Sequence, residues 1–435
     1  MRNYMYGEYL YNLRKSIGLS QGELGKMLGI SNKAVSKWEN GESKPAMKQM
    51  YSLSKIFGVS IEELMDIYES KKNSVTKIVI TGGPCAGKST ALSLIQKEFS
   101  KRGYHVITIS ETATDVILSG YTYNNMTSAL EFQKVVFGVQ LSKEKTFENA
   151  VNKITVSDKI LVICDRGLLD SKAYLSEIEF NQLLKSFGKN EVELRDNYDA
   201  VFHLVTAANG AEEYYTTANN SARIETLEEA RIADKRTLSA WAGHPHLRVI
   251  DNKFNFNDKI KNLIAEISSF IGEPEPYEIE RKFLIEMPDI NKINNPTLKK
   301  LEIIQTYLKT TSPDTEIRIR QRGYNGDYVY TKTEKKKITG IKRIEIEKRI
   351  SKDEYLNLLM DADTNIKQLR KTRYCFVYNN QYFELDIYPF WKDKAILEIE
   401  LKNESDAIQI PEYITIIKEV TDDDSYKNIN LTKLY

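Results

Sequence analysis

Hydrophobic and charged residues alternate one by one through much of the last third of the chain. Because successive side chains of a β-strand point to opposite faces, residues 278–285 are predicted to form a strand with one charged and one apolar face. The charged face carries Glu278, Glu280 and Lys282, and the apolar face carries Ile279, Phe283 and Ile285.

Seven further strands with this pattern are predicted, at residues 303–308, 316–322, 328–334, 341–350, 369–378, 382–388 and 396–402. Eight antiparallel strands are enough to close a barrel around a small ligand. Charges of both signs recur on one face of these strands, which indicates an enclosed site for a polyanion and its metal ions. The other interpretation is a wet surface on which the charges form cross-strand salt bridges that each contribute little. A predicted helix at 353–361 would help to cover the apolar face.

The middle of the chain contains a glycine-rich loop between a predicted strand at 77–81 and a predicted helix at 91–99. The loop is a G-x-x-x-x-G-K-S sequence in the strand–loop–helix context that it requires. Its backbone N–H groups and the helix N-terminus are expected to bind the phosphates of ATP or GTP. Lys88 would reach the β- and γ-phosphates, and Ser89 would ligate Mg²⁺. The loop residues are Gly82, Gly83, Pro84, Cys85, Ala86, Gly87, Lys88, Ser89 and Thr90.

Other predicted strands of this segment also end in charged residues. Asp165 follows the apolar strand 159–164, where a metal-binding carboxylate belongs in such a domain, although it is also placed to cap a turn. Glu111 follows another strand and is a weaker candidate for the acceptor site. With a strand at 200–205, the pattern predicts an α/β, doubly wound parallel sheet. The charged helix 228–236 is either a lid over the phosphates or a solvated helix.

Two resemblances to known families rest on these residues. The sequence Asp165-Arg166-Gly167 after a hydrophobic strand resembles nucleoside and nucleotide kinases, which implies a base or metal contact for Asp165 and a phosphate or acceptor contact for Arg166. The whole segment resembles the AAA-type P-loop domain of the ribosylnicotinamide-kinase-like group and of the TRPL-translocation-defect proteins. The phosphoryl acceptor stays open between a small molecule and water.

The run of residues 278–282, with the Arg-x-Arg and Glu-x-Glu strands that follow, resembles the CYTH or triphosphate-tunnel family over the whole tail. The resemblance implies that acidic residues hold Mg²⁺ or Mn²⁺ and that basic residues hold a triphosphate, whose terminal phosphorus is attacked by a water that the metal or a glutamate such as Glu280 activates. The metal candidates are Glu278, Glu280, Glu347, Asp386, Glu398 and Glu400. The phosphate candidates are Lys282, Arg318, Arg320, Lys332, Arg343, Lys371 and Arg373.

The head of the chain reads as four or five short helices. Ser20 with Glu23 and Ser60 with Glu63 fit capping boxes, and apolar residues recur at helical spacing. Residues 19–41 closely resemble the lambda-repressor-like (XRE) helix-turn-helix family, whose third helix enters the major groove and which usually binds as a dimer. A helical interaction domain is the alternative. The DNA-contact candidates are Gln21, Ser31, Asn32, Lys33, Ser36 and Lys37.

Composition limits the expected functions without changing the predicted fold. The 435 residues carry a net charge of +1, so any binding to nucleic acid must come from a local patch. Cys85, Cys164 and Cys375 have no metal-ligand spacing and are expected to be free thiols in a cytoplasmic protein. The first ten residues lack the apolar core of a signal peptide, so we expect none, and no apolar run is long enough to span a bilayer.

Polar stretches at 69–74 and 272–276 divide the chain into three expected domains. They are an all-α helix-turn-helix head at 1–70, an α/β P-loop domain at 75–271, and an antiparallel eight-stranded tunnel barrel with helices at 277–435. We expect a DNA-binding enzyme whose P-loop domain transfers or hydrolyses a γ-phosphate and whose barrel binds and hydrolyses tripolyphosphate or a nucleoside or thiamine triphosphate. The alternatives are a non-catalytic transcription regulator that senses such ligands and a phosphoinositide-type ligand binder.

Overall fold

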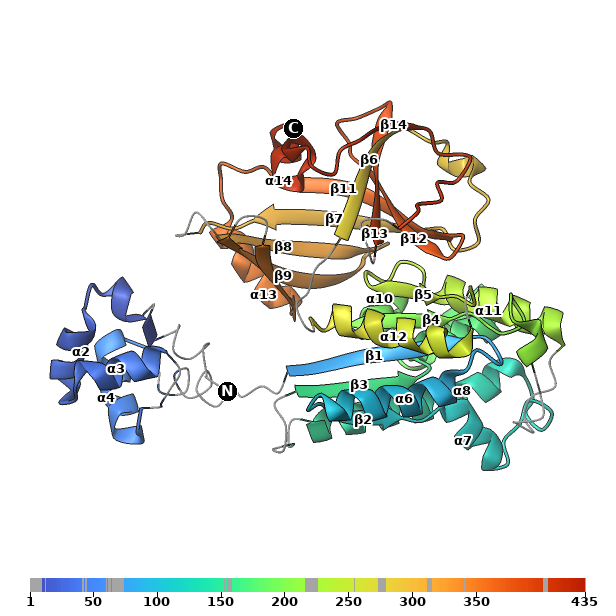
Figure 1. Ribbon diagram of the computed structural model, residues 1–435, viewed down its shortest axis with the longest axis horizontal. Helices are drawn as coiled ribbons and strands as arrows, with labels where there is room; N and C mark the ends of the chain where they lie inside the picture. Colours follow the sequence, from blue (N-terminus) through green and yellow to red (C-terminus); the bar gives the residue numbers. More distant parts are fainter. Residues whose placement is uncertain are drawn as a thin grey trace. The chain divides into compact units, whose positions relative to one another are not determined.

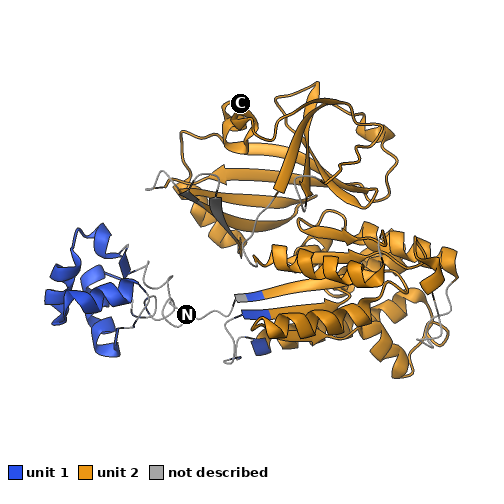
Figure 2. Cartoon of the chain, viewed as in Figure 1, with its two compact units in different colours: residues 1–75, 150–160 blue, residues 76–149, 161–435 orange. Residues whose placement is uncertain are grey.

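The structure is a computed structural model, and it describes residues 10–11, 13–40, 43, 45–59, 61, 64, 74–151, 154, 159–215, 226–253, 255–272, 279–310, 315–339, 342–401 and 406–434. The chain forms two compact units (Figure 2). The first comprises residues 1–75 with 150–160, and the second comprises residues 76–149 with 161–435. Nearly all of two β-sheets, one parallel and one antiparallel, lies in the second unit.

The first unit contains a helical head, as predicted. Its helices include α2 (Gln21–Leu28), α3 (Asn32–Glu39) and α4 (Met47–Phe57) (Figure 1). The predicted capping box starts α2, because the Ser20 hydroxyl accepts a bond from the Glu23 N–H and the Glu23 carboxylate accepts one from the Ser20 N–H. The second predicted box, Ser60 with Glu63, lies outside the described residues.

The turn between α2 and α3 depends on two glycines. Gly29 ends α2 with φ of 67°, the left-handed conformation that glycine adopts without strain. Gly25 allows α2 to approach the turn, since a Cβ at this position would lie 2.9 Å from the carbonyl oxygen of Ile30. The helices enclose a small apolar core of Leu10, Leu24, Val35, Trp38, Met50, Leu53 and Leu64.

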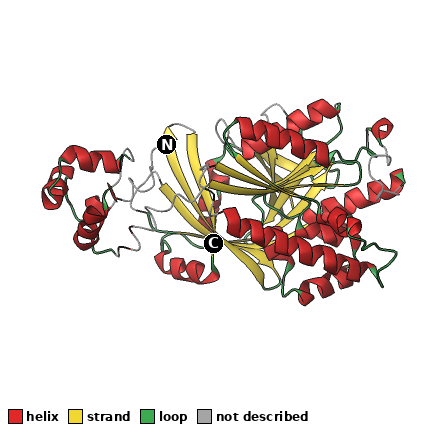
Figure 3. Cartoon of the chain, turned by 90° about the horizontal axis from the view of Figure 1, so that it is seen from below, coloured by secondary structure: helices red, strands yellow, loops and turns green. Residues whose placement is uncertain are grey.

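The parallel sheet has five strands in the order β2-β3-β1-β4-β5. They are β1 (Ser74–Gly82), β2 (His105–Ile109), β3 (Lys159–Asp165), β4 (Ala200–Leu204) and β5 (Leu247–Ile250). Helices cover both faces of the sheet (Figures 1 and 3), which confirms the predicted doubly wound architecture. They are α6 (Lys88–Lys101), α7 (Thr112–Leu118), α8 (Ala129–Val151), η1 (Leu168–Tyr174), α9 (Glu177–Ser186), α10 (Glu191–Arg195), η2 (Glu212–Tyr214), α11 (Leu227–Trp241) and α12 (Phe256–Phe270).

The antiparallel sheet has nine strands among the described residues, in the order β10-β9-β8-β7-β11-β12-β13-β6-β14. Eight correspond to the predicted strands. The ninth, β14, was not predicted, because its sequence Ile-Ile-Lys-Glu does not alternate and all four side chains are exposed. The strands are β6 (Ile279–Glu286), β7 (Lys299–Tyr307), β8 (Thr315–Tyr324), β9 (Asp327–Thr339), β10 (Lys342–Ile350), β11 (Leu369–Tyr378), β12 (Gln381–Ile387), β13 (Lys394–Leu401) and β14 (Ile416–Glu419).

The apolar face of this sheet is covered partly by helices and partly by loops. Phe283, Ile285 and Leu397 of the sheet form a core with residues of the connecting segments such as Leu298 and Ile414. As predicted, a helix after β10 lies against this face at β9 (Figure 1). The helix near the C-terminus lies against β11 on the other face, where its Leu431 packs with Leu284 and Leu369. The short helices of this region are η3 (Ile290–Lys292), α13 (Lys352–Leu358), η4 (Leu359–Asp361), η5 (Asp424–Tyr426), α14 (Asn428–Leu431) and η6 (Thr432–Leu434).

Candidate phosphate and DNA sites

The phosphate loop between β1 and α6 has a backbone that requires glycine at two positions. Gly82 has φ of 143°, and a Cβ on it would lie 2.1 Å from the carbonyl oxygen of Leu204. Gly87 has φ of 87°, and a Cβ there would lie 2.5 Å from the ring of Phe256. The glycines of the sequence motif therefore let the loop lie close against the end of β4 and the start of α12.

Asp234 of α11 holds the phosphate loop in place through a hydrogen bond to its backbone. The Gly83 N–H donates to the Asp234 carboxylate at 2.7 Å, and the Thr206 N–H donates to the same oxygen at 3.2 Å. Burial opposes ionisation, but His203 and these N–H donors hold the pKa of Asp234 below its ordinary value. The sequence predicts either a lid or a solvated helix here, and its pattern of mixed charges gives no signal for this buried supporting role.

Lys88 and Asp165 lie close enough to influence each other electrostatically. The Lys88 ammonium lies 3.2 Å from the Gly83 carbonyl oxygen. Asp165 ends β3, and its buried Oδ1 has no hydrogen-bond partner among the described residues. Burial raises the pKa of Asp165 to about 6, although Lys88 opposes the shift. A buried carboxylate oxygen without a protein donor suits a hard divalent cation, so Asp165 with the exposed Ser89 fits Mg²⁺.

Arg166, next to Asp165, is held between two carboxylates. Its Nε donates to Glu111 at 2.5 Å, and its Nη1 donates to Asp170 at 3.2 Å. Although burial opposes ionisation, Arg166 and Lys88 lower the pKa of Glu111 to about 2. The structure thus brings together the strand-end residues that the sequence indicated, and Glu111 serves to orient the guanidinium of Arg166.

Lys259 of α12 is a further residue at the loop that the sequence did not reveal. Its ammonium donates to the carbonyl oxygens of Ala86 and Val205, at 3.2 and 2.7 Å, and to Oδ1 of Asn252 at 2.7 Å. Burial lowers the pKa of Lys259 to about 8. One lysine in a helix with an apolar stripe looks like an ordinary surface residue, so only the fold shows that it ties the loop to the ends of β4 and β5.

The charged residues of the antiparallel sheet share one face, which we call the charged face. Residues that are cross-strand partners lie on the same side of a sheet. The pairing register of the strands between β6 and β10 therefore places most of the predicted ligand residues on this one face. Asp386, Lys371 and Glu398 are buried there, which contradicts the interpretation of a wet surface. The charged face carries Glu280, Lys282, Arg318, Arg320, Glu347, Lys371, Arg373, Asp386, Glu398 and Glu400.

Arg373 and Lys371 hold the acids of β12 and β13. Arg373 donates to Asp386 at 2.6 and 2.7 Å and to Glu398 at 2.7 Å, and it also binds Glu384. Lys371 donates to Asp386 at 2.5 Å. These pairs form a buried network in which both bases are already bound to acids, so a ligand has to exchange partners with it.

Glu280 and Lys282 lie at the other end of this network. The Lys282 ammonium lies 2.7 Å from Glu398 and 3.0 Å from Glu280. Burial and the charge of Glu398 raise the pKa of Glu280 to about 7, against the effect of Lys282. Among the described residues no group of three or more His, Cys, Asp or Glu is arranged as a metal site. A partly protonated glutamate beside Glu398 and Glu400 is nevertheless suited to exchange its proton for Mg²⁺ or Mn²⁺.

Arginines of β8 form the cationic side of the charged face. Arg318 and Arg320 are cross-strand neighbours of Thr333 and Thr331, and Arg320 lies 3.9 Å from Glu347. Burial and the charge of Arg318 lower the pKa of Arg320. Guanidinium groups that are close together and mostly shielded from solvent favour an anion with several oxygens, such as a phosphate.

Three predicted ligand residues are not on the described charged face. Lys332 pairs with Ile319, which is buried on the opposite side of β8, so the register places Lys332 on the other face of the sheet. The sequence around it, Thr-Lys-Thr-Glu-Lys, has no apolar alternation that would reveal its register. Glu278 lies outside the described residues, and Arg343 lies in β10 with its side chain outside them.

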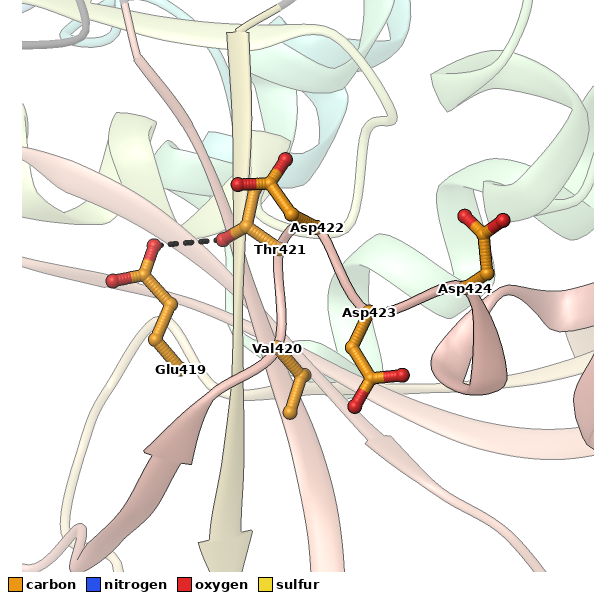
Figure 4. A pocket seen from close by; sticks show the side chains of 6 residues that line it. All are labelled: Glu419, Val420, Thr421, Asp422, Asp423 and Asp424. Atoms are coloured by element: carbon orange, nitrogen blue, oxygen red, sulfur yellow. Dashed lines mark hydrogen bonds between the residues drawn. The ribbon is translucent and has the colours of Figure 1, made fainter.

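An acidic hollow of about 550 Å³ follows β14 and is a weaker candidate (Figure 4). Two of its carboxylates have partners within the chain: Glu419 binds Arg281 and the Thr421 hydroxyl, and Asp423 binds Lys418. The side chains of Asp422 and Asp423 point in opposite directions in Figure 4. The hollow is therefore a turn stabilised by its own hydrogen bonds, and we assign it no ligand.

The predicted DNA-contact residues divide into exposed and structural ones. Asn32, Lys33 and Lys37 are exposed on α3. The Ser31 hydroxyl caps α3 by accepting from the Ala34 N–H, Gln21 donates to Glu39 at 2.8 Å, and Ser36 accepts from Asn40 at 3.4 Å. The exposed residues are thus the better candidates for base and phosphate contacts. In the described part of the chain, no helix is long and apolar enough to cross a membrane.

Proteins similar to this chain match different parts of it. The HTH-type transcriptional activator BcrR of Enterococcus faecalis is 40% identical over 60 residues, which are 14% of this chain and 29% of that protein. Repressor protein C2 of Salmonella phage P22 is 37% identical over 65 residues, 15% of this chain and 30% of that protein. The chain therefore spans less than a third of the length of these curated relatives.

Three solved structures are similar to parts of the chain. The inorganic triphosphatase NE1496 is 29% identical and covers 36% of this chain and 94% of its own, with a TM-score of 0.27. The P22 c2 repressor in complex with a synthetic operator is 38% identical, over 14% of this chain and 91% of its own, with a TM-score of 0.14. Thymidylate kinase from Ehrlichia chaffeensis is 13% identical, over 46% of this chain and 99% of its own, with a TM-score of 0.31.

Three family models match the chain without overlap. A helix-turn-helix model matches residues 10–64, an AAA domain model matches residues 77–259, and a CYTH domain model matches residues 276–421. The chain therefore carries a helix-turn-helix domain, an AAA domain and a CYTH domain, in that order.

Proposed function

We propose that this protein is a DNA-binding, nucleotide-dependent enzyme with two separate sites for polyphosphates. The observation that carries the proposal is the contrast between a glycine-built phosphate loop in the AAA domain and a buried charged face in the CYTH domain. Each site combines phosphate-binding bases with carboxylates that fit a divalent cation. A cation bound at either site would neutralise phosphate oxygens and favour attack on the terminal phosphorus.

In the AAA domain, the proposed ligand is ATP or GTP. The loop N–H groups and Lys88 bind the phosphates, and Asp165 with Ser89 holds the cation. Arg166 is oriented by Glu111 and Asp170 toward the acceptor side of the loop, where it binds a phosphate oxygen or the acceptor. Asp165 is the proposed base or metal contact, and its pKa of about 6 leaves it ionised at neutral pH.

In the CYTH domain, the proposed ligand is a linear triphosphate such as tripolyphosphate or a nucleoside or thiamine triphosphate. Arg318, Arg320 and Arg373 bind phosphate oxygens together with Lys282 and Lys371. Glu280, Glu398 and Glu400 hold the cation, with Glu347 and Asp386 as further carboxylates of the site. Glu280, whose pKa lies near 7, is able to accept a proton from the attacking water at neutral pH.

The head is proposed to bind DNA through α3. Asn32 and Lys33 are exposed at the start of this helix and reach base edges in the proposed complex, while Lys37 binds the backbone. The names of the similar proteins, a transcriptional activator and a phage repressor, support this role. A homodimer on paired half-sites is part of the proposal.

A screen of phosphate release tests the two enzymatic assignments. The full chain is incubated with ATP, GTP, tripolyphosphate or thiamine triphosphate, each with Mg²⁺ or Mn²⁺. We expect metal-dependent release from at least one nucleotide and from tripolyphosphate. Absence of release from every substrate would contradict both assignments.

A second function, a regulator that senses ligands without cleaving them, is favoured by one observation. Both oxygens of Glu398 are engaged by Lys282 and Arg373, so part of the cation site is already neutralised by the protein. Tight binding of tripolyphosphate without release of phosphate, together with a ligand-dependent change in DNA affinity, would support the sensor.

A further inference from the structure

The charged face of the CYTH domain has one acid whose partner comes from the AAA domain. Arg248, in β5, donates a hydrogen bond to Glu400 of β13, and both residues lie within the second compact unit. Glu400 is a cross-strand neighbour of Glu280 and follows Glu398 on the same face of β13. Arg248 therefore reaches the edge of the proposed triphosphate site from a different domain.

His246, two residues before Arg248, faces the same group of charges. Burial lowers the pKa of His246, and the charges that act on it include Glu400, Glu347 and Arg322. These three residues belong to β13, β10 and β8, so they come from opposite sides of the charged face. His246 is thus within electrostatic reach of charges on three strands of the face, while Arg248 contacts the face directly through Glu400.

A second contact fixes the AAA domain in this position. Arg322, the last arginine on the charged side of β8, donates to Asp196 at 2.8 Å and to the carbonyl oxygen of Gly243. Arg322 and Asp196 are both buried. β5 also lies against β12, and α10 lies against β9. Arg322 is therefore committed to anchoring the domains and is not a phosphate ligand.

Arg248 is more exposed than Arg322 and is bound less firmly by its partners. Its side chain is 25% exposed, its partner Glu400 is 31% exposed, and its other carboxylate neighbour, Glu266, lies 3.8 Å away. A partly solvated arginine pair of this kind costs little to open. The planar guanidinium is also well matched to phosphate oxygens, so a triphosphate that enters the face competes well with Glu400 for Arg248.

We propose that the AAA domain completes the triphosphate site of the CYTH domain, with Arg248 as a ligand for the terminal part of the polyphosphate chain and His246 beside it. On binding, Arg248 exchanges Glu400 for phosphate oxygens, and Glu400 is released toward the cation. The inference rests on the proposed function of the charged face, because it assigns one more residue to that same site.

The test uses the full chain carrying Lys88→Ala, so that tripolyphosphate reports on the charged face and not on the phosphate loop. In this background, Arg248→Ala is compared with Arg102→Ala, which removes another AAA-domain arginine paired with a glutamate, Glu98. We expect Arg248→Ala to weaken tripolyphosphate binding about tenfold or more, and Arg102→Ala to leave it within about twofold. Arg248→Lys keeps the charge and is expected to lose less.

Hydrogen exchange provides a second readout that needs no change at Arg248. Saturating tripolyphosphate is expected to slow exchange of the amides of β5 in the Lys88→Ala protein. Unchanged affinity in Arg248→Ala and unchanged exchange in β5, with tripolyphosphate still bound, would overturn this inference alone. Failure of the parent protein to bind tripolyphosphate at all would overturn the proposed function of the charged face and the inference with it.

Discussion

The phosphate loop and the charged face differ in how each would hold the polyphosphate proposed for it. The loop uses backbone shape: glycines place main-chain groups, and Lys88 adds one charge. The charged face uses side chains that neutralise one another before any ligand arrives, as Arg373 does with Asp386 and Glu398. The loop is therefore ready for its ligand, whereas the face has to exchange internal ion pairs for ligand contacts. The face gains charge density and selectivity at the cost of buried charges that depend on one another.

The largest expected effect comes from breaking the ion-pair network. Arg373→Ala leaves Asp386, Glu384 and Glu398 short of a buried partner, so we expect the free energy of unfolding to fall by about 3–5 kcal/mol. Arg281→Ala is the matched control, because Arg281 pairs with Glu419 on the surface and its loss is expected to cost below about 1 kcal/mol. Denaturant unfolding of both variants measures the difference. Equal losses in the free energy of unfolding would show that the network tolerates the loss of one base.

The loop is expected to respond in function rather than in stability. Lys88→Ala removes its main charge, so we expect nucleotide turnover to fall by about 10²–10³-fold with little change in unfolding. Lys97→Ala, on the exposed side of α6, is the control and should turn over nucleotide normally. A similar loss in both variants would contradict the assignment of Lys88.

The two sites are also expected to lose their cations at different pH. Glu280 has a pKa of about 7 and Asp165 a pKa of about 6, and a proton on either carboxylate competes with the metal. The metal affinity of the charged face should therefore fall as the pH drops below about 7, whereas that of the loop should fall only below about 6. Each affinity should decrease by up to about tenfold per pH unit. Mn²⁺ titrations across this range measure both, and Glu280→Gln should abolish the higher transition.

The same shift predicts how stability changes with pH when no metal is present. The pKa of Glu280 is raised from 4.5 to about 7 in the folded protein, so the folded state binds the proton more tightly than the unfolded state. The contribution of Glu280 to stability is thus present below about pH 4.5 and is lost as the pH rises through about 7. In Glu280→Gln, the dependence of the unfolding midpoint on pH over this range should flatten; an unaltered slope would show that another group causes it.

The smallest expected effect is that of Lys332→Ala, and it tests the register of the charged face. Arg320→Ala should weaken tripolyphosphate binding about tenfold or more, because the guanidinium lies on the charged face. Lys332→Ala should change the affinity less than about twofold, because Lys332 shares the side of Ile319. Calorimetric titration of both variants in the Lys88→Ala background measures the two affinities. A large loss of affinity in Lys332→Ala would show that the register of β9 differs by one residue.

Sequence alone anticipates the loop better than the charged face, and the reason is locality. Nine consecutive residues define the loop, and their glycine spacing states the backbone shape. The charged face depends on which strands pair and in which register. The lysine-rich run of β9 does not encode this register, so the sequence alone does not show that Lys332 lies on the opposite face. Asp234 and Lys259 hold the loop from distant segments, and Arg248 is proposed to serve the charged face in the same way. A charged residue in an ordinary helix or strand gives no local sign of such a role.

Separate phosphate chemistry at the two sites is the central claim, and one measurement tests it most directly. Phosphate release from the preferred nucleotide and from tripolyphosphate is followed in the wild-type chain, in Lys88→Ala and in Glu280→Gln. We predict that Lys88→Ala loses nucleotide turnover and keeps tripolyphosphate hydrolysis, while Glu280→Gln shows the reverse. Loss of both activities in either variant, or no change in tripolyphosphate hydrolysis in Glu280→Gln, would contradict the account.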